Sequence, residues 1–130
     1  MARRKTDLLT EVELEFMKAL WEIGRGTVRD VYRALESDKP RAYTSVATVL
    51  KVLESKGYVT SGKEDRTLVY RAIVARDAYE SRSLREISKS LFGGTPQAMV
   101  ARLVEDEELT DDMIREIRAI IDERIARDGS

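Results

Sequence analysis

The 130-residue sequence contains no cysteine and no histidine, and only two prolines and seven glycines. Without cysteine the chain can form neither disulfides nor thiolate metal sites, which fits a reducing cytoplasm. The commonest general bases, nucleophiles and transition-metal ligands are missing too. We therefore expect no catalytic site, no metal site and no cofactor, and we predict that the protein is not an enzyme.

Long apolar runs are also missing. The longest fall far short of the roughly 18 residues that span a bilayer, and no apolar segment follows the basic N-terminus. We expect a cytoplasmic protein without membrane insertion. The net charge is only −1, but residues 1–72 carry 14 Lys and Arg against 11 Asp and Glu, whereas residues 73–130 carry 9 against 13. The first part can therefore approach a polyphosphate that the second would repel.

The most informative segment of the chain is residues 41–59. Apolar residues recur there at the spacing of one helical stripe, namely Val46, Val49, Leu50 and Leu53. The opposite face is small, polar or basic and comprises Thr44, Ala47, Thr48, Lys51 and Ser55. Gly57 can supply the left-handed residue that ends a helix, and a strand pattern follows at once. This order is typical of the recognition helix and first wing strand of a winged helix-turn-helix.

Two further helices are predicted before this one. Thr10 and Glu13 match a capping box at the start of the first helix, and Gly24 is placed to end it. Thr27 opens the second helix, which leads to a polar turn at residues 37–40. After the third helix, short strands are predicted at residues 59–62 and 68–72, joined by a charged hairpin tip at residues 63–66.

The remaining residues predict three short helices with much apolar surface. They cover residues 76–92 and 95–105 and a last helix capped by Thr110. Alone they could hardly form a stable core, so they either pack back on the winged helix or pair with a second copy, and we favour pairing. The predicted dimerisation residues are Leu91, Phe92, Met99, Val100, Leu103, Ile114, Ile117 and Ile121.

Hydroxyls and cations on the third helix, the wing and the basic N-terminal arm suit double-stranded DNA. Hydroxyls can bond base edges or phosphates, threonine methyls can contact thymine methyls, and cations can bind phosphates. The amino end of the second helix offers N–H groups to another phosphate. The predicted DNA-binding residues are Arg4, Lys5, Thr27, Tyr43, Thr44, Ser45, Thr48, Lys51, Lys63 and Arg66.

Two points qualify how this surface would read sequence. Tyr43 can either pack at the start of the helix or touch the sugar-phosphate chain. The exposed face of the third helix carries neither arginine nor asparagine, so we expect selectivity to depend on hydroxyl, methyl and shape readout.

Several segments, in this order, resemble the penicillinase/methicillin-resistance repressor family. They are LTEVELEFMKALW from Leu9, TVRDV from Thr27, AYTSVATVL from Ala42, LESKGYV from Leu53 and LFGG from Leu91. The resemblance covers nearly the whole chain, about residues 9–124.

The resemblance implies a dimeric winged-helix repressor whose C-terminal helices interlock and which binds palindromic operators. In the penicillinase branch, a membrane sensor-protease signals the antibiotic, and the repressor is cut in its C-terminal region. The equivalent bond here joins Arg102 and Leu103, where that branch typically has Asn-Phe. The copper-responsive branch senses metal with C-terminal cysteines, which this chain lacks.

We therefore predict a mainly α protein with a small β-wing. Residues 1–74 would form a winged helix-turn-helix DNA-binding domain, and residues 75–130 a helical dimerisation region. A symmetric dimer would present its two reading helices about 34 Å apart, one turn of the duplex. The predicted function is transcriptional repression, with control by a small-molecule effector as a variant. The alternative is a winged-helix protein–protein interaction module that does not bind DNA.

Overall fold

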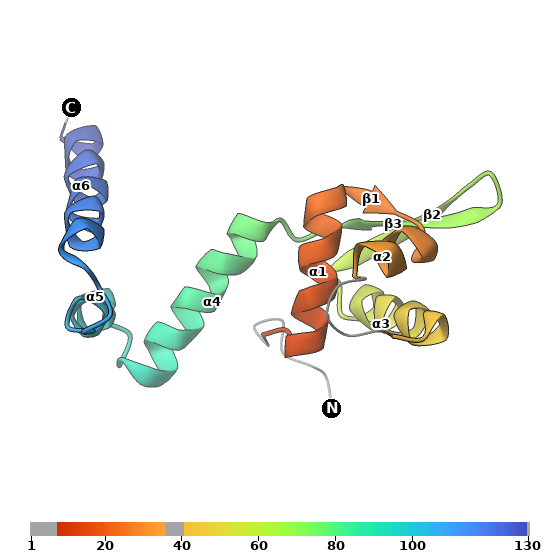
Figure 1. Ribbon diagram of the computed structural model, residues 1–130, viewed down its shortest axis with the longest axis horizontal. Coiled ribbons are helices and arrows are strands. Elements are labelled where there is room, and N and C mark those ends of the chain that lie inside the picture. The colour runs from red at the N-terminus through yellow and green to blue at the C-terminus, as the bar shows by residue number, and fades with distance from the viewer. Residues whose placement is uncertain (1–7, 36–40, 130) are drawn as a thin grey trace. The chain divides into compact units, whose positions relative to one another are not determined.

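The computed structural model describes residues 8–35 and 41–129 (Figure 1). The predicted contacts Arg4 and Lys5, and the polar turn at residues 37–40, lie outside the described residues. The chain divides into two compact units, residues 1–84 and 85–130.

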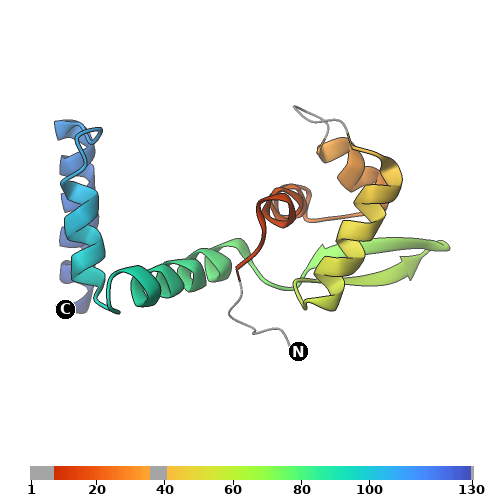
Figure 2. The ribbon, with the colours of Figure 1, turned by 90° about the horizontal axis from the view of Figure 1, so that it is seen from below.

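The first unit has the predicted order of helices and strands, with one additional strand. Its elements are α1 (Glu11–Ile23), β1 (Arg25–Gly26), α2 (Val28–Ala34), α3 (Tyr43–Ser55), β2 (Val59–Glu64), β3 (Thr67–Ala72) and the first half of α4 (Arg76–Leu91). The three strands form an antiparallel sheet in the order β1-β3-β2. The β2–β3 hairpin projects away from the three helices in two perpendicular views (Figures 1 and 2).

The helix ends follow from local capping, as predicted. Thr10 Oγ1 accepts a hydrogen bond from the Glu13 N–H at 3.1 Å, and the Glu13 carboxylate accepts one from the Thr10 N–H at 2.9 Å. Gly24 ends α1 with a φ of 85°, and Gly57 follows α3 with a φ of 86°. Both values lie in the left-handed region that glycine adopts most easily.

The wing hairpin is longer and its turn tighter than predicted. Strands β2 and β3 remain paired from Val59–Ala72 out to Glu64–Thr67. Lys63 therefore belongs to β2, and only two residues form the turn. These are Asp65 and Arg66, with φ values of 51° and 69°. Two-residue hairpins favour such left-handed pairs because their twist matches that of the strands.

Strand β1 was missed because two residues carry no periodic pattern. Arg25 pairs with Arg71 and Gly26 with Tyr70 on β3. Gly26 is buried, and a Cβ atom there would lie 2.8 Å from the Cβ of Asp30. Glycine is therefore required for this close approach between β1 and α2.

The core of the first unit lies between its helices and the sheet. Its buried residues are Phe16, Met17, Leu20, Val31, Val46, Leu50, Leu53, Tyr58, Val59, Tyr70 and Tyr79. The stripe predicted on α3 is thus the inner face of that helix, with Val49 half-buried beside it.

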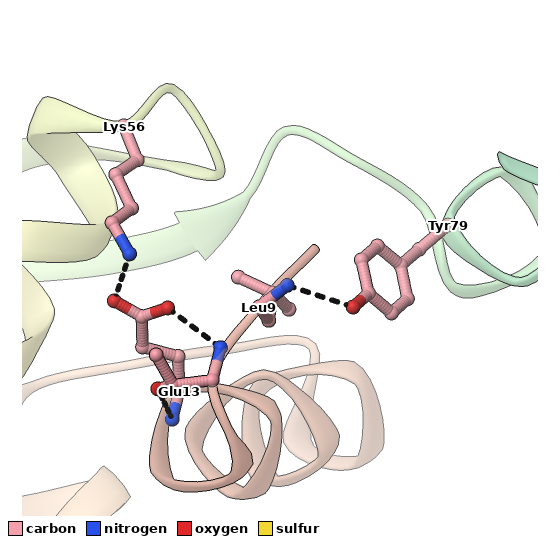
Figure 3. A network of polar contacts seen from close by, with 5 residues as sticks. Leu9, Glu13, Lys56 and Tyr79 are labelled. Atoms are coloured by element: carbon pink, nitrogen blue, oxygen red, sulfur yellow. Dashed lines mark hydrogen bonds and ion pairs between the residues drawn. The ribbon is translucent and has the colours of Figure 1, made fainter. Parts of the chain in front are cut away.

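The start of α4 packs on the winged helix through an aromatic cluster. The ring of Tyr79 lies 6.0 Å from that of Trp21 and 6.1 Å from that of Tyr58, measured between centroids. Its hydroxyl accepts a hydrogen bond from the Leu9 N–H at 2.9 Å (Figure 3). Trp21 Nε1 donates to the Val74 carbonyl at 2.9 Å. Because of these contacts the compact unit extends past residue 74 into α4.

The second unit contains the end of α4, α5 (Pro96–Val104) and α6 (Asp111–Asp128). Thr110 caps α6, as predicted, by accepting a hydrogen bond from the Met113 N–H at 3.1 Å. Thr95 occupies the N-cap position of α5, but its side chain does not cap that helix. Its hydroxyl donates back to the Phe92 carbonyl at 3.0 Å. Among the described residues, no helix has both the length and the apolar character to cross a bilayer.

Candidate nucleic-acid interface

Helix α3 is tied to α1 by an ion pair at each end. Before the helix, the Arg41 guanidinium pairs with the Glu15 carboxylate and lies 5.7 Å from the centroid of the Phe16 ring. At the other end Lys56 Nζ donates to the Glu13 carboxylate, and both side chains are only 9% exposed (Figure 3). Both acids belong to the first turns of α1, so the two pairs set the position of α3 against α1.

Glu13 holds two elements with one carboxylate. Burial alone raises the pKa of Glu13, but the Lys56 ammonium and the Thr10 N–H bond its charged form and outweigh that effect. The net pKa lies below its ordinary value of 4.5. The ionised carboxylate therefore caps α1 and anchors the end of α3.

The outward face of α3 is exposed where DNA contacts were predicted. Residues Tyr43, Thr44, Ser45, Thr48 and Lys51 are all exposed. The Thr48 hydroxyl donates to the Thr44 carbonyl at 3.0 Å. In this geometry Thr48 presents its methyl group and the lone pairs of its oxygen, so it can contact a thymine methyl or accept a hydrogen bond from a base.

Tyr43 packs at the start of α3, which is one of the two roles considered for it. Its ring packs against Tyr32 of α2, with centroids 5.7 Å apart and planes 61° apart. The residue nevertheless remains 45% exposed. Tyr43 therefore packs at the start of α3 and still leaves part of its surface open to solvent.

The amino end of α2 differs from the expected phosphate site. Thr27 Oγ1 accepts a hydrogen bond from the Asp30 N–H at 3.1 Å, and the Asp30 carboxylate accepts one from the Thr27 N–H at 3.0 Å. These bonds lower the pKa of Asp30. The charged Asp30 carboxylate thus already accepts the Thr27 N–H that a phosphate would use. The Thr27 hydroxyl still has its own proton to donate.

The cations in and beside the wing differ in whether a carboxylate lies next to them. Glu64 pairs with Arg25 of β1 and lies 3.8 Å from the Arg71 guanidinium of β3. Lys63 and Arg66 are exposed, and no carboxylate in the described parts of the chain pairs with either. The two predicted wing contacts are therefore available to an external anion.

The predicted dimerisation residues all lie in the second unit, and none is buried. Exposed are Leu91, Val100, Leu103, Ile114 and Ile121; half-buried are Phe92, Met99 and Ile117. Arg102, in the predicted cleavage site, is exposed like Leu103 and lies 3.6 Å from Glu105. Within residues 8–35 and 41–129, no group of three acidic side chains is placed to hold a metal.

Comparison with known proteins agrees with this architecture. The sequence model of the penicillinase repressor matches residues 9–123. The transcriptional regulator BlaI of Mycobacterium tuberculosis is 31% identical over 103 residues, 78% of this chain and 75% of that protein. The penicillinase repressor of Bacillus licheniformis is 25% identical over 120 residues, 92% of this chain and 94% of its own.

A solved structure supports the fold. The DNA-binding domain of the repressor BlaI superposes with a TM-score of 0.51 at 24% identity, covering 60% of this chain and 94% of that domain. The predicted fold class, mainly α with a small β-wing, is confirmed. The chain belongs to the penicillinase repressor family.

Proposed function

We propose that this chain is a homodimeric transcriptional repressor that binds a palindromic operator in double-stranded DNA. The observation that carries the proposal is α3 itself, whose ends are held by buried or half-buried ion pairs while its hydroxyl-bearing face is exposed. In a helix-turn-helix, such a face enters the major groove. Thr44, Ser45 and Thr48 would contact base edges, and Lys51 and Arg66 would contact phosphates.

The experiment is operator selection followed by competition. Duplexes bound by the full chain are selected from a random pool, and affinity is then compared between the selected duplex and a scrambled one at several salt concentrations. A palindromic consensus with strong preference over the scrambled duplex supports the proposal. Equal affinity for both, or no binding at low salt, contradicts it; the latter with a co-purifying protein would favour an interaction module.

A matched pair of variants locates the base readout. Thr48→Val keeps the methyl group and replaces the hydroxyl with a second methyl, whereas Thr48→Ser keeps the hydroxyl and removes the methyl. We expect each to change preference at one operator position by about 1–3 kcal/mol, the range for a base contact. A preference unchanged in both variants would remove Thr48 from the reading surface.

The dimer is supported by the apolar surface of the second unit. Helices α5 and α6 have no buried residue, although they carry many isoleucine, leucine and valine side chains. A second copy would remove this surface from water. Sedimentation should show a dimer, and a monomeric wild-type chain would contradict this part of the proposal.

Regulation is proposed to act in the cytoplasm through cleavage between Arg102 and Leu103, with a membrane sensor-protease as the partner. Its support is the family and the exposure of both residues on α5. Cells expressing the chain with a family sensor-protease should yield, on induction, a fragment beginning at Leu103. An intact chain under induction would contradict this mode of control.

A further inference from the structure

Arg29 of α2 lies against the aromatic ring that begins α3. Its guanidinium carbon is 5.8 Å from the centroid of the Tyr43 ring. Tyr32, three residues later on the same face of α2, packs against the same ring at 5.7 Å. Tyr43 therefore contacts two consecutive turns of α2 and gives the Arg29 side chain a surface on which to rest.

Arg29 also differs from three other arginines of the first unit. Arg25, Arg41 and Arg76 each pair with a carboxylate, on Glu64, Glu15 and Glu80 respectively. No carboxylate in the described ranges pairs with Arg29, which is exposed. An aromatic ring attracts the flat face of a guanidinium and leaves the N–H donors in its plane directed outward. Those donors match the geometry of a phosphate.

We propose that Arg29 binds a phosphate of the DNA backbone and that Tyr43 is its positioning residue. The inference rests on the proposed function and adds a contact from α2 to those of α3 and the wing. In helix-turn-helix proteins the first helix of the motif crosses the sugar-phosphate chain. Arg29 is on that helix, directly beside the amino end of the recognition helix, so both can meet the same strand.

The test measures affinity for a fixed mixed-sequence duplex as a function of salt. Arg29→Gln should lower the slope of log affinity against log salt by about 0.9 per protomer, which is about an eightfold loss of affinity at 0.1 M salt. Arg29→Lys keeps the charge and should restore the slope. Arg76→Gln, which removes an arginine paired on α4, is the matched control and should leave the slope unchanged.

The role of Tyr43 is tested by repeating Arg29→Gln in two backgrounds. Tyr43→Phe retains the ring, so the full effect of Arg29→Gln is expected. Tyr43→Leu removes the ring, and the effect should shrink to less than half. Equal effects in both backgrounds would overturn the positioning role. Thermal unfolding of each variant identifies any that is not folded, and Arg29→Ala, which also removes the charge and favours the helix, provides the same test if Arg29→Gln does not fold.

Two failures remain distinguishable. If the wild-type chain binds the duplex with a clear salt dependence and Arg29→Gln leaves that slope unchanged, the phosphate contact is overturned and the proposed function stands. If the wild-type chain binds no duplex at any salt concentration, both are overturned.

Discussion

The two units of this chain place their apolar residues in opposite ways. In the first unit, side chains such as Phe16, Leu20 and Leu50 are completely buried. In the second, Leu91, Ile120 and Ile125 are 63–72% exposed, and α5 and α6 bury no residue. The first unit therefore contains its own core, whereas the second requires a covering surface. We infer that assembly and folding of the second unit are one process.

The largest effect is expected from breaking that covering surface. Ile117→Asp together with Ile121→Asp places two charges on the apolar face of α6. We expect monomers, with operator affinity reduced about 10²–10⁴-fold because the second half-site contact is no longer intramolecular. Sedimentation and operator titration measure the two effects.

A control separates charge from position. Ala119→Asp adds one carboxylate to α6 about 200° away from Ile117 and should leave the dimer intact. A double variant that remains dimeric would contradict the predicted pairing through α6. One that becomes monomeric without losing operator affinity would contradict the dependence of DNA binding by the first unit on dimerisation of the second.

The next effect concerns the internal support of the first unit. Lys56→Met leaves the Glu13 carboxylate buried without its cation, and breaking a buried pair in this way costs about 3 kcal/mol. Arg76→Gln breaks the exposed pair with Glu80, which is worth less than about 1 kcal/mol. Chemical denaturation compares the two. Equal losses would show that the Glu13–Lys56 pair does not support α3.

The same carboxylate predicts a dependence of stability on pH. The pKa of Glu13 is lower in the folded chain than its ordinary value of 4.5. Its contribution to the free energy of unfolding is therefore complete above about pH 4.5 and is lost as the pH falls through the lowered pKa. Glu13→Gln should be less stable at neutral pH, but its stability should change less on acidification. Parallel acid curves for both proteins would contradict this assignment.

These pairs also show how far sequence could lead. The helix starts at Thr10, Thr27 and Thr110 could be predicted from the sequence. Each threonine hydroxyl bonds the N–H of a residue only three positions later, so the local sequence contains both partners. The pairs of Glu13 with Lys56 and Glu15 with Arg41 join residues 43 and 26 positions apart, and no local pattern encodes them.

The candidate site likewise has features that the sequence predicts and features that depend on the fold. The exposed face of α3 followed from helical periodicity, because burying one stripe dictates which side chains point outward. The Arg29–Tyr43 contact depends on the angle between α2 and α3, and the charge of Asp30 at the Thr27 cap depends on a side-chain bond. Neither could be derived before the fold was known.

A smaller effect tests the exposed face without touching its support. Lys51→Ala should weaken binding to every duplex and lower the salt slope by about 0.9 per protomer, while the unfolding midpoint stays the same because the side chain is exposed. Lys18→Ala removes an exposed lysine from α1 and serves as the control. If both variants keep the wild-type slope, Lys51 makes no phosphate contact.

The smallest effect lies at the wing turn, where stability and binding should separate. Asp65 and Arg66 both have left-handed φ values, which are unfavourable for residues other than glycine. Arg66→Gly should therefore stabilise the first unit by about 0.5–1 kcal/mol, and Asp65→Gly by less, because aspartate tolerates a left-handed φ better than arginine. Only Arg66→Gly removes a cation, so only it should lose DNA affinity, whereas Asp65→Gly removes an acid and should gain. If the two variants change affinity equally, the left-handed arginine serves the turn and not the DNA.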